Sequence, residues 1–332
     1  MLRFLVSIVL LLGGLVAQRY TISSDPWIAW APVWVAQEKG LWRQYGIEVE
    51  VVAYDGNDAA ASLAAGKVDF CMAMAGTAVG MRVEQRQDVV VLAEVDWSHG
   101  GDKLLLQQGL ERGGLRGKRV GVYEESPAVL MYLAAELNTV GLSVKDVELI
   151  SIDDPEALAS QVAAGHLSAA VLYEPFVAPA LRGGAARVVG STADFPGVMP
   201  ECVLAMRERV AKMPPAHIVA LLQGWIDAVE WARQPANEAE FLRLCVEHAF
   251  GSEKVSIDDA RRMLTNVRLH DRPMLRERNL GGEGIRAWLD RAVAFALARS
   301  PAPSTPRPEL GPLFEPRWLR EALGAAVATP AK

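Results

Sequence analysis

Residues 30–54 read WAPVWVAQEKGLWRQYGIEVEVVAY, and this stretch decides the fold class of the chain. Its first part, residues 30–46, is typical of a helix that ends at Gly46. Its second part, residues 47–54, alternates apolar and polar residues as a half-buried strand does. A helix that runs directly into such a strand favours an α/β chain, in which the two kinds of element alternate.

The same alternation continues on both sides of this stretch. One series of elements ends at residue 97, and a second series follows it as far as residue 206. Strands and helices at this spacing predict parallel sheets with helices on both faces. The predicted strands cover residues 19–23, 47–54, 68–73, 89–97, 104–108, 115–123, 147–152, 169–174, 187–190 and 203–206, and the helices between them cover residues 30–46, 58–67, 76–86, 126–141, 155–165 and 175–182.

From residue 214 onward the pattern becomes helical. Ile218, Leu221, Trp225 and Val229 recur at the spacing of one helix face. The proline-rich stretch further on is typical of a linker. The remaining predicted elements are helices over residues 238–249, 256–266 and 284–298, a linker over residues 300–312 and a last short helix over residues 317–325.

Composition excludes several classes of protein. The chain of 332 residues has a net charge of −6 and no long basic run, so we expect no nucleic-acid partner. Its three cysteines are scattered, which argues against a disulfide framework. Its five histidines show no metal-ligand spacing, so we expect no metal and no cofactor.

The first 17 residues are typical of a secretory signal peptide. Arg3 precedes an apolar run over residues 4–17, which is too short for an ordinary transmembrane span. An uncleaved membrane anchor is the alternative. No cysteine follows the run, so we expect an exported periplasmic protein that is not a lipoprotein.

Two α/β series joined by two chain crossings predict a hinged clamp. The sequence divides into lobe 1 (residues 18–98 and 206–299), lobe 2 (residues 99–205) and a C-terminal linker and helix (residues 300–332). Ligands of open α/β sheets bind outside the carboxyl ends of the strands. Closure of the two lobes would bury a small molecule between those ends.

The strand ends supply the candidate ligand-binding residues, and none of them suggests catalysis. Acids occur at three of these ends without any Arg or Lys, which makes sense if the ligand brings positive charge or N–H donors. Purely structural roles are the alternative, since the tryptophans could belong to the core and the serine could simply cap a helix. The candidates are Trp27, Trp30, Thr77, Asp96, Trp97, Ser126, Glu174 and Glu201.

Several phrases in fixed order resemble a known family. APVWVAQEKGLWRQYGIEVEVV, LAAGKVDF, LRGKRVGVY and AAVLYEPF are similar to solute-binding proteins of ABC importers, in the branch that binds nitrate, sulfonate, taurine and thiamine precursors. The resemblance covers residues 19–232. VDWSHGGD and YEPF look most like a subgroup encoded near urea-carboxylase-type enzymes. The resemblance implies a type II periplasmic-binding-protein fold, with two Rossmann-like lobes around a hinged cleft.

The resemblance also implies a function. It suggests a monomeric, non-enzymatic periplasmic component of an ABC importer, which captures a small nitrogen-containing solute and works with permease and ATPase subunits. The solute would be an amine, a guanidine-like or urea-like compound, taurine or an aminopyrimidine. One alternative is an enzyme like the thiamine-pyrimidine synthases, although the chain lacks their cysteine-rich motif. Another is a ligand-sensing partner of a signalling receptor.

Overall fold

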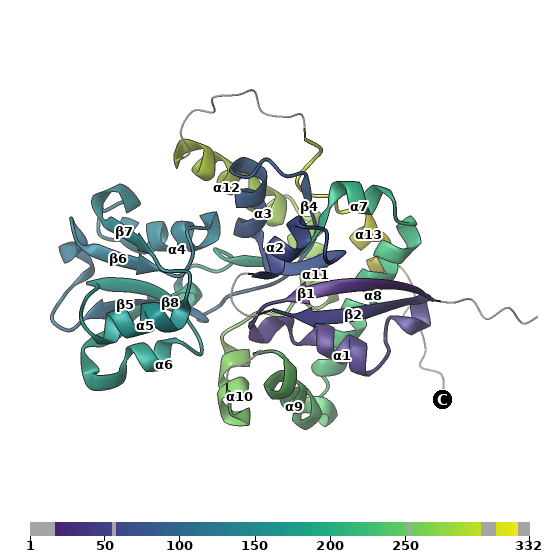
Figure 1. Ribbon diagram of the computed structural model, residues 1–332, viewed down its shortest axis with the longest axis horizontal. Coiled ribbons are helices and arrows are strands. Elements are labelled where there is room, and N and C mark those ends of the chain that lie inside the picture. The colour runs from purple at the N-terminus through teal and green to yellow at the C-terminus, as the bar shows by residue number, and fades with distance from the viewer. Residues whose placement is uncertain (1–16, 55–57, 251–253, 300–309, 325–332) are drawn as a thin grey trace, which may run out of the picture.

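Two five-stranded sheets, each covered by helices, form two lobes that lie side by side in the computed structural model (Figure 1). The structure describes residues 17–54, 58–250, 254–299 and 310–324. The predicted signal peptide, apart from Ala17, and most of the predicted linker therefore lie outside the described residues. The predicted α/β fold class is confirmed.

The first sheet forms the centre of lobe 1. Three strands, β2, β1 and β3, run parallel, and β10 lies antiparallel between β3 and β4. β4 is buried along almost its whole length, which suits a strand that packs on both faces. In spatial order the strands are β2 (Ile47–Ala53), β1 (Gln18–Ser24), β3 (Phe70–Met74), β10 (Pro200–Met206) and β4 (Val89–Trp97).

The second sheet forms the centre of lobe 2 and repeats this design. Its first three strands are parallel, and β5 lies antiparallel between β8 and β9. The inserted antiparallel strand thus occupies the fourth position in both sheets. In spatial order the strands are β7 (Glu148–Ser151), β6 (Arg119–Val122), β8 (Ala169–Tyr173), β5 (Asp102–Gln107) and β9 (Ala186–Ser191).

The prediction of wholly parallel sheets is wrong at these two inserted strands. Each follows a crossing between the lobes, since β5 begins five residues after Trp97 and β10 follows the return from lobe 2. The expected end of lobe 2 at residue 205 is also wrong, because β10 already belongs to the first sheet. A buried strand shows the same apolar pattern in either direction, so the sequence alone does not reveal its orientation.

The predicted helix over residues 30–46 is broken into three pieces. A 3₁₀ turn (η1, Ile28–Trp30) precedes α1 (Pro32–Glu38), and a second 3₁₀ turn (η2, Arg43–Tyr45) follows it. Gly40 ends the regular helix because it adopts a φ of +63°, which favours glycine. The other helices before residue 200 are α2 (Asp58–Ala64), α3 (Ala75–Val83), α4 (Pro127–Asn138), α5 (Pro155–Ala163) and α6 (Val177–Ala180).

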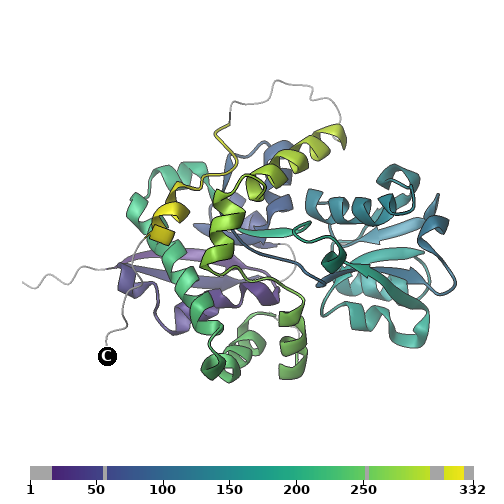
Figure 2. The same cartoon turned by 180° about the vertical axis from the view of Figure 1, so that it is seen from behind.

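After β10 the chain is helical and most of it returns to lobe 1 (Figure 2). α13 packs on α8, while α12 contacts both α3 of lobe 1 and α4 of lobe 2. Two of these helices, α7 and α11, were not predicted. The set comprises α7 (Arg207–Ala211), α8 (Pro215–Ala232), α9 (Glu238–His248), α10 (Ile257–Thr265), α11 (Arg272–Leu280), α12 (Ile285–Arg299) and α13 (Arg317–Gly324).

Helix α8 packs closely against the segment between α1 and β2, which contains Trp42. The indole of Trp42 is buried and donates a hydrogen bond of 3.0 Å to the Leu221 carbonyl. Gly224 makes room for this ring, because a Cβ there would lie 2.1 Å from Trp42 Cδ1. None of the helices in the described ranges is long and apolar enough to cross a membrane.

Gly224→Ala tests this packing. Alanine favours a helix interior by up to about 1 kcal/mol relative to glycine, but overpacking costs about 1–3 kcal/mol. Because the added Cβ would lie so close to the Trp42 ring, we expect the clash to dominate and the melting temperature to fall. Gly80→Ala in α3 is the control, since a Cβ there meets nothing within 4 Å. A variant that melts at or above the parent temperature would contradict this packing.

Candidate ligand-binding site

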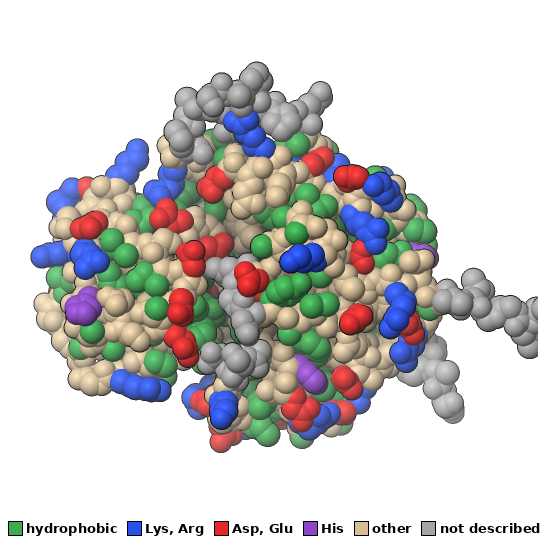
Figure 3. Space-filling model, in the orientation of Figure 1, with side chains coloured by type: hydrophobic (Ala, Val, Ile, Leu, Met, Phe, Trp, Pro, Cys, Tyr) green, Lys and Arg blue, Asp and Glu red, His purple; other side chains and the backbone are tan. Residues whose placement is uncertain are grey.

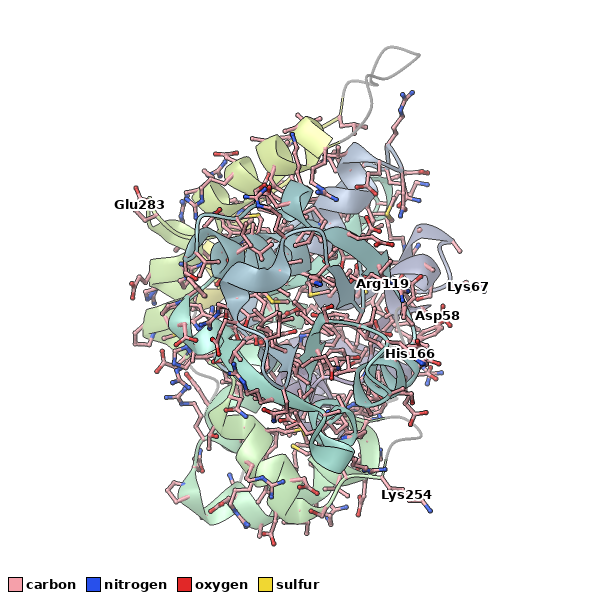
Figure 4. The ribbon with its side chains drawn as sticks, turned by 90° about the vertical axis from the view of Figure 1, so that its left-hand side faces the viewer. Asp58, Lys67, Arg119, His166, Lys254 and Glu283 are labelled. Atoms are coloured by element: carbon pink, nitrogen blue, oxygen red, sulfur yellow. The ribbon has the colours of Figure 1, made fainter. Side chains whose placement is uncertain are left out.

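A cavity of about 810 Å³ lies between the two lobes. α2 and α3 form its lobe 1 wall, and the ends of β6, β7 and β8 form its lobe 2 wall. Viewed with lobe 2 in front, Asp58 and Lys67, which bracket α2, lie on the same side of the molecule as His166 (Figure 4). Five of the eight predicted site residues line the cavity: Trp27, Trp30, Thr77, Ser126 and Glu201.

The two lobes touch directly beside this cavity. A Cβ at Gly76 in α3 would lie 2.5 Å from the backbone nitrogen of Ala128 in α4. The Thr77 hydroxyl also forms a hydrogen bond with the Glu124 carboxylate, and this bond again joins the lobes. Ser126 caps α4 by accepting a hydrogen bond from Val129 N at 3.5 Å. The two lobes are therefore in contact at one side of the cavity, and Ser126 is both a cap and a lining residue.

The cavity lining is strongly acidic. None of the described residues that line it is Lys, Arg or His. Acidic side chains also gather along the boundary between the lobes in the space-filling view (Figure 3). The lining carboxylates are Asp25, Glu84, Asp102, Glu124, Glu125, Asp153 and Glu201.

Glu201 is the one predicted acid that lines the cavity, and it is deeply buried. It lies opposite Asp96 on the neighbouring strand, is 3% exposed, and its Oε2 has no hydrogen-bond partner within the described part of the chain. Burial raises the pKa of Glu201 well above its usual range, and the charges of Asp96 and Asp102 raise it further. Such an unpartnered carboxylate favours a ligand that donates N–H groups.

Asp96 lies behind the cavity wall, not in it. The Trp27 indole donates a hydrogen bond of 3.2 Å to Asp96 Oδ1. The Trp30 indole also acts on this carboxylate, although Trp30 Nε1 forms no hydrogen bond of normal geometry with the described residues. Burial nevertheless raises the pKa of Asp96 well above its usual range. Asp96 therefore orients Trp27, and both tryptophans belong to the core and also line the cavity.

Aromatic rings from both lobes complete the inner end of the cavity. Tyr123 donates a hydrogen bond of 2.7 Å to Asp102 Oδ1, and its ring centroid lies 4.7 Å from that of Tyr173. Trp27 of lobe 1 meets Tyr173 edge-on at 6.3 Å. Aromatic faces next to carboxylates can bind a cation through both kinds of group.

Several lining residues are not among the candidates that the sequence suggested, and they include Asp102, Tyr123, Glu124 and Tyr173. The positions of these residues next to strand ends could have identified them from the sequence. Tyr123 follows β6 directly, Tyr173 is the last residue of β8, and Asp102 is the first residue of β5. The rule that ligands lie at strand ends applies to these positions as well as to their chosen neighbours.

Trp97 and Glu174 do not line the cavity. The Trp97 ring packs against His270, with ring centroids 5.1 Å apart, and Arg278 lies over it at 4.9 Å. Glu174 forms an ion pair of 3.1 Å with Lys103. Trp97 lies outside the cavity because side chains alternate along a strand, so Trp97 and Asp96 point to opposite faces of β4. The last residue of β8, Tyr173, takes the cavity position that was expected for Glu174.

The reverse face of β4 is held by a buried ionic cluster. Glu94 is fully buried and accepts hydrogen bonds from Arg278 at 2.9 and 3.1 Å, and its Oε1 lies 3.1 Å from His270 Nε2. The Asn279 side chain bonds both backbone groups of Glu94. Arg278 and Asn279 belong to α11, which therefore fixes the strand that carries Asp96.

The chain crossings are joined by hydroxyl groups. Ser98 Oγ lies 2.7 Å from Thr192 Oγ1, which connects the outgoing and returning segments. The same Thr192 oxygen accepts a hydrogen bond from Gly100 N at 2.8 Å. Gly100 adopts a φ of +103°, a conformation that strongly favours glycine. Residues 98–101 thus lie at the crossing between the sheets.

Glu124 is a second unusual carboxyl. Burial, together with the charges of Asp153 and Glu84, raises its pKa to about 7, despite the hydrogen bond with Thr77. The structure contains no group of three or more His, Cys, Asp or Glu side chains that could hold a metal ion within its described ranges.

The paired sheets, the two crossings and the cavity between them define the periplasmic-binding-protein fold. The chain belongs to the NMT1-like family, whose model matches residues 18–246. The predicted recognition is confirmed at this level, and the urea-carboxylase-associated subgroup stays a prediction. No functionally curated protein matches the chain in sequence.

Solved structures share the fold at low sequence identity. A ligand-binding component of an ABC-type import system from Staphylococcus aureus, with zinc bound, has a TM-score of 0.70 and 14% identity, covering 94% of this chain and 100% of that one. The alkanesulfonate-binding protein SsuA from Xanthomonas axonopodis pv. citri, bound to MOPS, has a TM-score of 0.65 and 17% identity, covering 85% and 93%. The periplasmic nitrate-binding protein NrtA from Synechocystis has a TM-score of 0.58 and 17% identity, covering 73% and 69%.

The buried carboxyls generate a prediction about stability and pH. Their pKa values are raised in the folded protein, so the folded state binds more protons than the unfolded state between about pH 4 and about pH 7. The free energy of unfolding should therefore fall as the pH rises through this window. We expect the ligand-free protein to melt at a lower temperature at about pH 8 than at about pH 5.5.

Glu201→Gln separates this effect from the rest of the chain. The variant removes a buried charge and should reduce the difference between the two melting temperatures, mainly by raising the value at high pH. Glu277→Gln is an isosteric control at an exposed position. Melting curves of equal pH dependence in the parent and in Glu201→Gln would contradict the burial of this carboxyl.

Proposed function

We propose that this chain is the solute-binding component of an ABC importer and that it captures a small, positively charged nitrogen compound between its lobes. The observation that carries the proposal is the cavity lining, which has seven carboxylates and no basic side chain among its described residues. A closing cavity removes water from those carboxylates, and this desolvation is costly unless a cation replaces the water. An amine, a guanidine-like compound or an aminopyrimidine fits this requirement.

The site supports recognition through charge and aromatic contact together. Glu201 offers an oxygen without a partner among the described groups, and Asp102 is held in place by the Tyr123 hydroxyl. Trp27, Tyr123 and Tyr173 supply ring faces and edges at the same end of the cavity. Cation–π contacts at desolvated sites contribute about 2 kcal/mol, which adds to the charge-assisted hydrogen bonds.

Anionic ligands are less suitable for this cavity. Two structural neighbours are named for alkanesulfonate and nitrate, and both of these are anions. In the present chain such a ligand would face several carboxylates without a compensating Lys or Arg in the described lining. Taurine, one of the expected solutes, carries an amine that suits the acids and a sulfonate that does not.

Binding explains the site better than catalysis does. No histidine or cysteine belongs to the described lining, so a nucleophile or proton shuttle of those kinds is not placed at the ligand. A synthase of the thiamine-pyrimidine type would need such groups. Among the neighbours, the Staphylococcus aureus and Xanthomonas axonopodis proteins are named as binding proteins. We therefore retain a non-enzymatic role. The alternative is that the ligand-bound protein interacts with a signalling receptor.

The proposed role includes a place and partners. The sequence pattern of residues 1–17 supports export to the periplasm. Delivery would then require a permease and an ATPase, and a single chain would suffice because both walls of the cavity come from one copy. Sequencing the N-terminus of the native protein tests the export step, and a mature chain that begins near Gln18 is the expected result.

Calorimetric titration tests the charge of the ligand. We expect the parent to bind at least one amine, guanidine-like or aminopyrimidine cation and to bind nitrate and simple sulfonates weakly. Glu201→Gln should weaken cation binding by about tenfold to a hundredfold, since a hydrogen bond to a charged group contributes about 1.5–3 kcal/mol. Glu208→Gln, an isosteric change at an exposed residue of α7, should bind as the parent does. Tight nitrate binding by the parent would overturn the proposal.

Gly76→Ala tests closure. The added Cβ would collide with the backbone of Ala128, which cannot move aside as a flexible side chain could. We expect a saturating cation to reduce the radius of gyration of the parent but not of this variant, as measured by X-ray scattering. Gly113→Ala is the control, since a Cβ there meets nothing within 4 Å. Equal contraction of the parent and Gly76→Ala would show that the lobes do not close through this contact.

A further inference from the structure

Five of the seven lining carboxylates fall into an inner and an outer group. The inner group consists of Asp102 and Glu201, which are 2% and 3% exposed and follow the two chain crossings. The outer group consists of Glu84 at the end of α3, Glu124 after β6 and Asp153 after β7. Glu124 is partly buried, whereas Glu84 and Asp153 are exposed. Acidic groups therefore occur both at the enclosed end and at the rim of the cavity.

The basic side chains of the described residues do not neutralise either group. Glu125, a further rim acid, is paired with Arg299 at 3.9 Å, and Glu174 is paired with Lys103. By contrast, none of the inner or outer acids forms an ion pair with a basic side chain in the part of the chain that the structure describes. The unpartnered Oε2 of Glu201 independently marks the inner group as a place that lacks a donor.

A cation with one charged group would satisfy one end of this arrangement only. Bound at the inner acids, it would leave Glu124 and its neighbours without a positive partner in the closed clamp. Glu124 interacts electrostatically with Glu201 as well as with Asp153 and Glu84, so it connects the two groups. The acids thus line the cavity at both its inner end and its rim.

Part of the cavity wall is apolar. Four alanines of α2 and its C-terminal turn line the cavity, and Met74 and Met81 line it too. Methylene groups can pack on such a surface without leaving polar atoms unsatisfied. Together, the acids and this wall suit charged groups that are separated by a flexible carbon chain. The lining alanines are Ala60, Ala61, Ala64 and Ala65.

We propose that the ligand is a linear aliphatic compound with at least two protonated amino groups, one held by Asp102 and Glu201 and another by Glu124 with Asp153 and Glu84. This inference rests on the proposed function and makes it more specific, because it names a polyamine-like substrate class. Trp27 and Tyr123 enclose the inner ammonium group. The carbon chain lies along α2, and the outer ammonium group bridges the lobes, since Glu84 belongs to lobe 1 and Glu124 to lobe 2.

The test compares ligands that differ by one charge at equal length. Butylamine and 1,4-diaminobutane are titrated into the full chain by calorimetry, together with 1,3-diaminopropane, 1,5-diaminopentane and spermidine. We expect the best diamine or spermidine to bind at least about tenfold more tightly than butylamine. Glu124→Gln should reduce this ratio by weakening the diamine alone, whereas Glu201→Gln should weaken both butylamine and the diamine. Glu208→Gln is the matched control, and melting curves show that each variant is folded.

The outcomes separate the two proposals. If butylamine and every diamine bind within about twofold of each other, the two-charge ligand is wrong while a cationic ligand stands. The same conclusion follows if only guanidine-like or aminopyrimidine compounds bind. If no cation binds and nitrate or a sulfonate does, the proposed function itself is wrong. A diamine preference that survives Glu124→Gln unchanged overturns the assignment of the outer group.

Discussion

The structure depends on one constraint. The fourth strand of each sheet is the first strand that the chain forms after it has crossed from the other lobe. β5 enters lobe 2 directly after the first crossing, and β10 enters lobe 1 directly after the second. The hydroxyls of Ser98 and Thr192 hold the crossings together at 2.7 Å. Because both inserted strands are flanked on two sides, the crossings cannot shift without disturbing the centre of a sheet. Motion between the lobes is therefore confined to the few residues between the strands.

This arrangement explains where the acids lie. Asp96, Asp102 and Glu201 are all within a few residues of a crossing, so they stay close together whether the clamp is open or shut. Glu84 and Glu124 are on different lobes and away from the crossings, so opening separates them. Under the proposed lobe closure, the inner acids would therefore stay together, and the outer group would assemble only when the lobes close. A ligand that contacts both groups would therefore bind more tightly to the closed form than to the open form.

The sequence was informative about elements and strand ends but not about pairing partners or directions. Alternation in residues 47–54 predicted β2, and the strand-end rule found Glu201, Trp27 and Thr77. It failed by one residue at Glu174, where Tyr173 faces the cavity, and at Trp97, which points to the reverse face of β4. Which of two adjacent residues faces a cavity depends on the local twist, and β10 has irregular register just at Glu201. Helix α11, which holds Glu94, was missed because its sequence is mostly polar.

The inserted strands also impose an order on synthesis. Every strand of the second sheet lies between Asp102 and Ser191, so lobe 2 can complete its sheet as soon as that segment has emerged from the channel through which the chain passes. Lobe 1 begins first but lacks the strand between β3 and β4 until residues 200–206 have been made. The N-terminal segment must therefore wait for a partner encoded more than a hundred residues downstream of β4. When the chain emerges from its N-terminus onward, the sheet of lobe 1 therefore begins to form before that of lobe 2 but is completed after it.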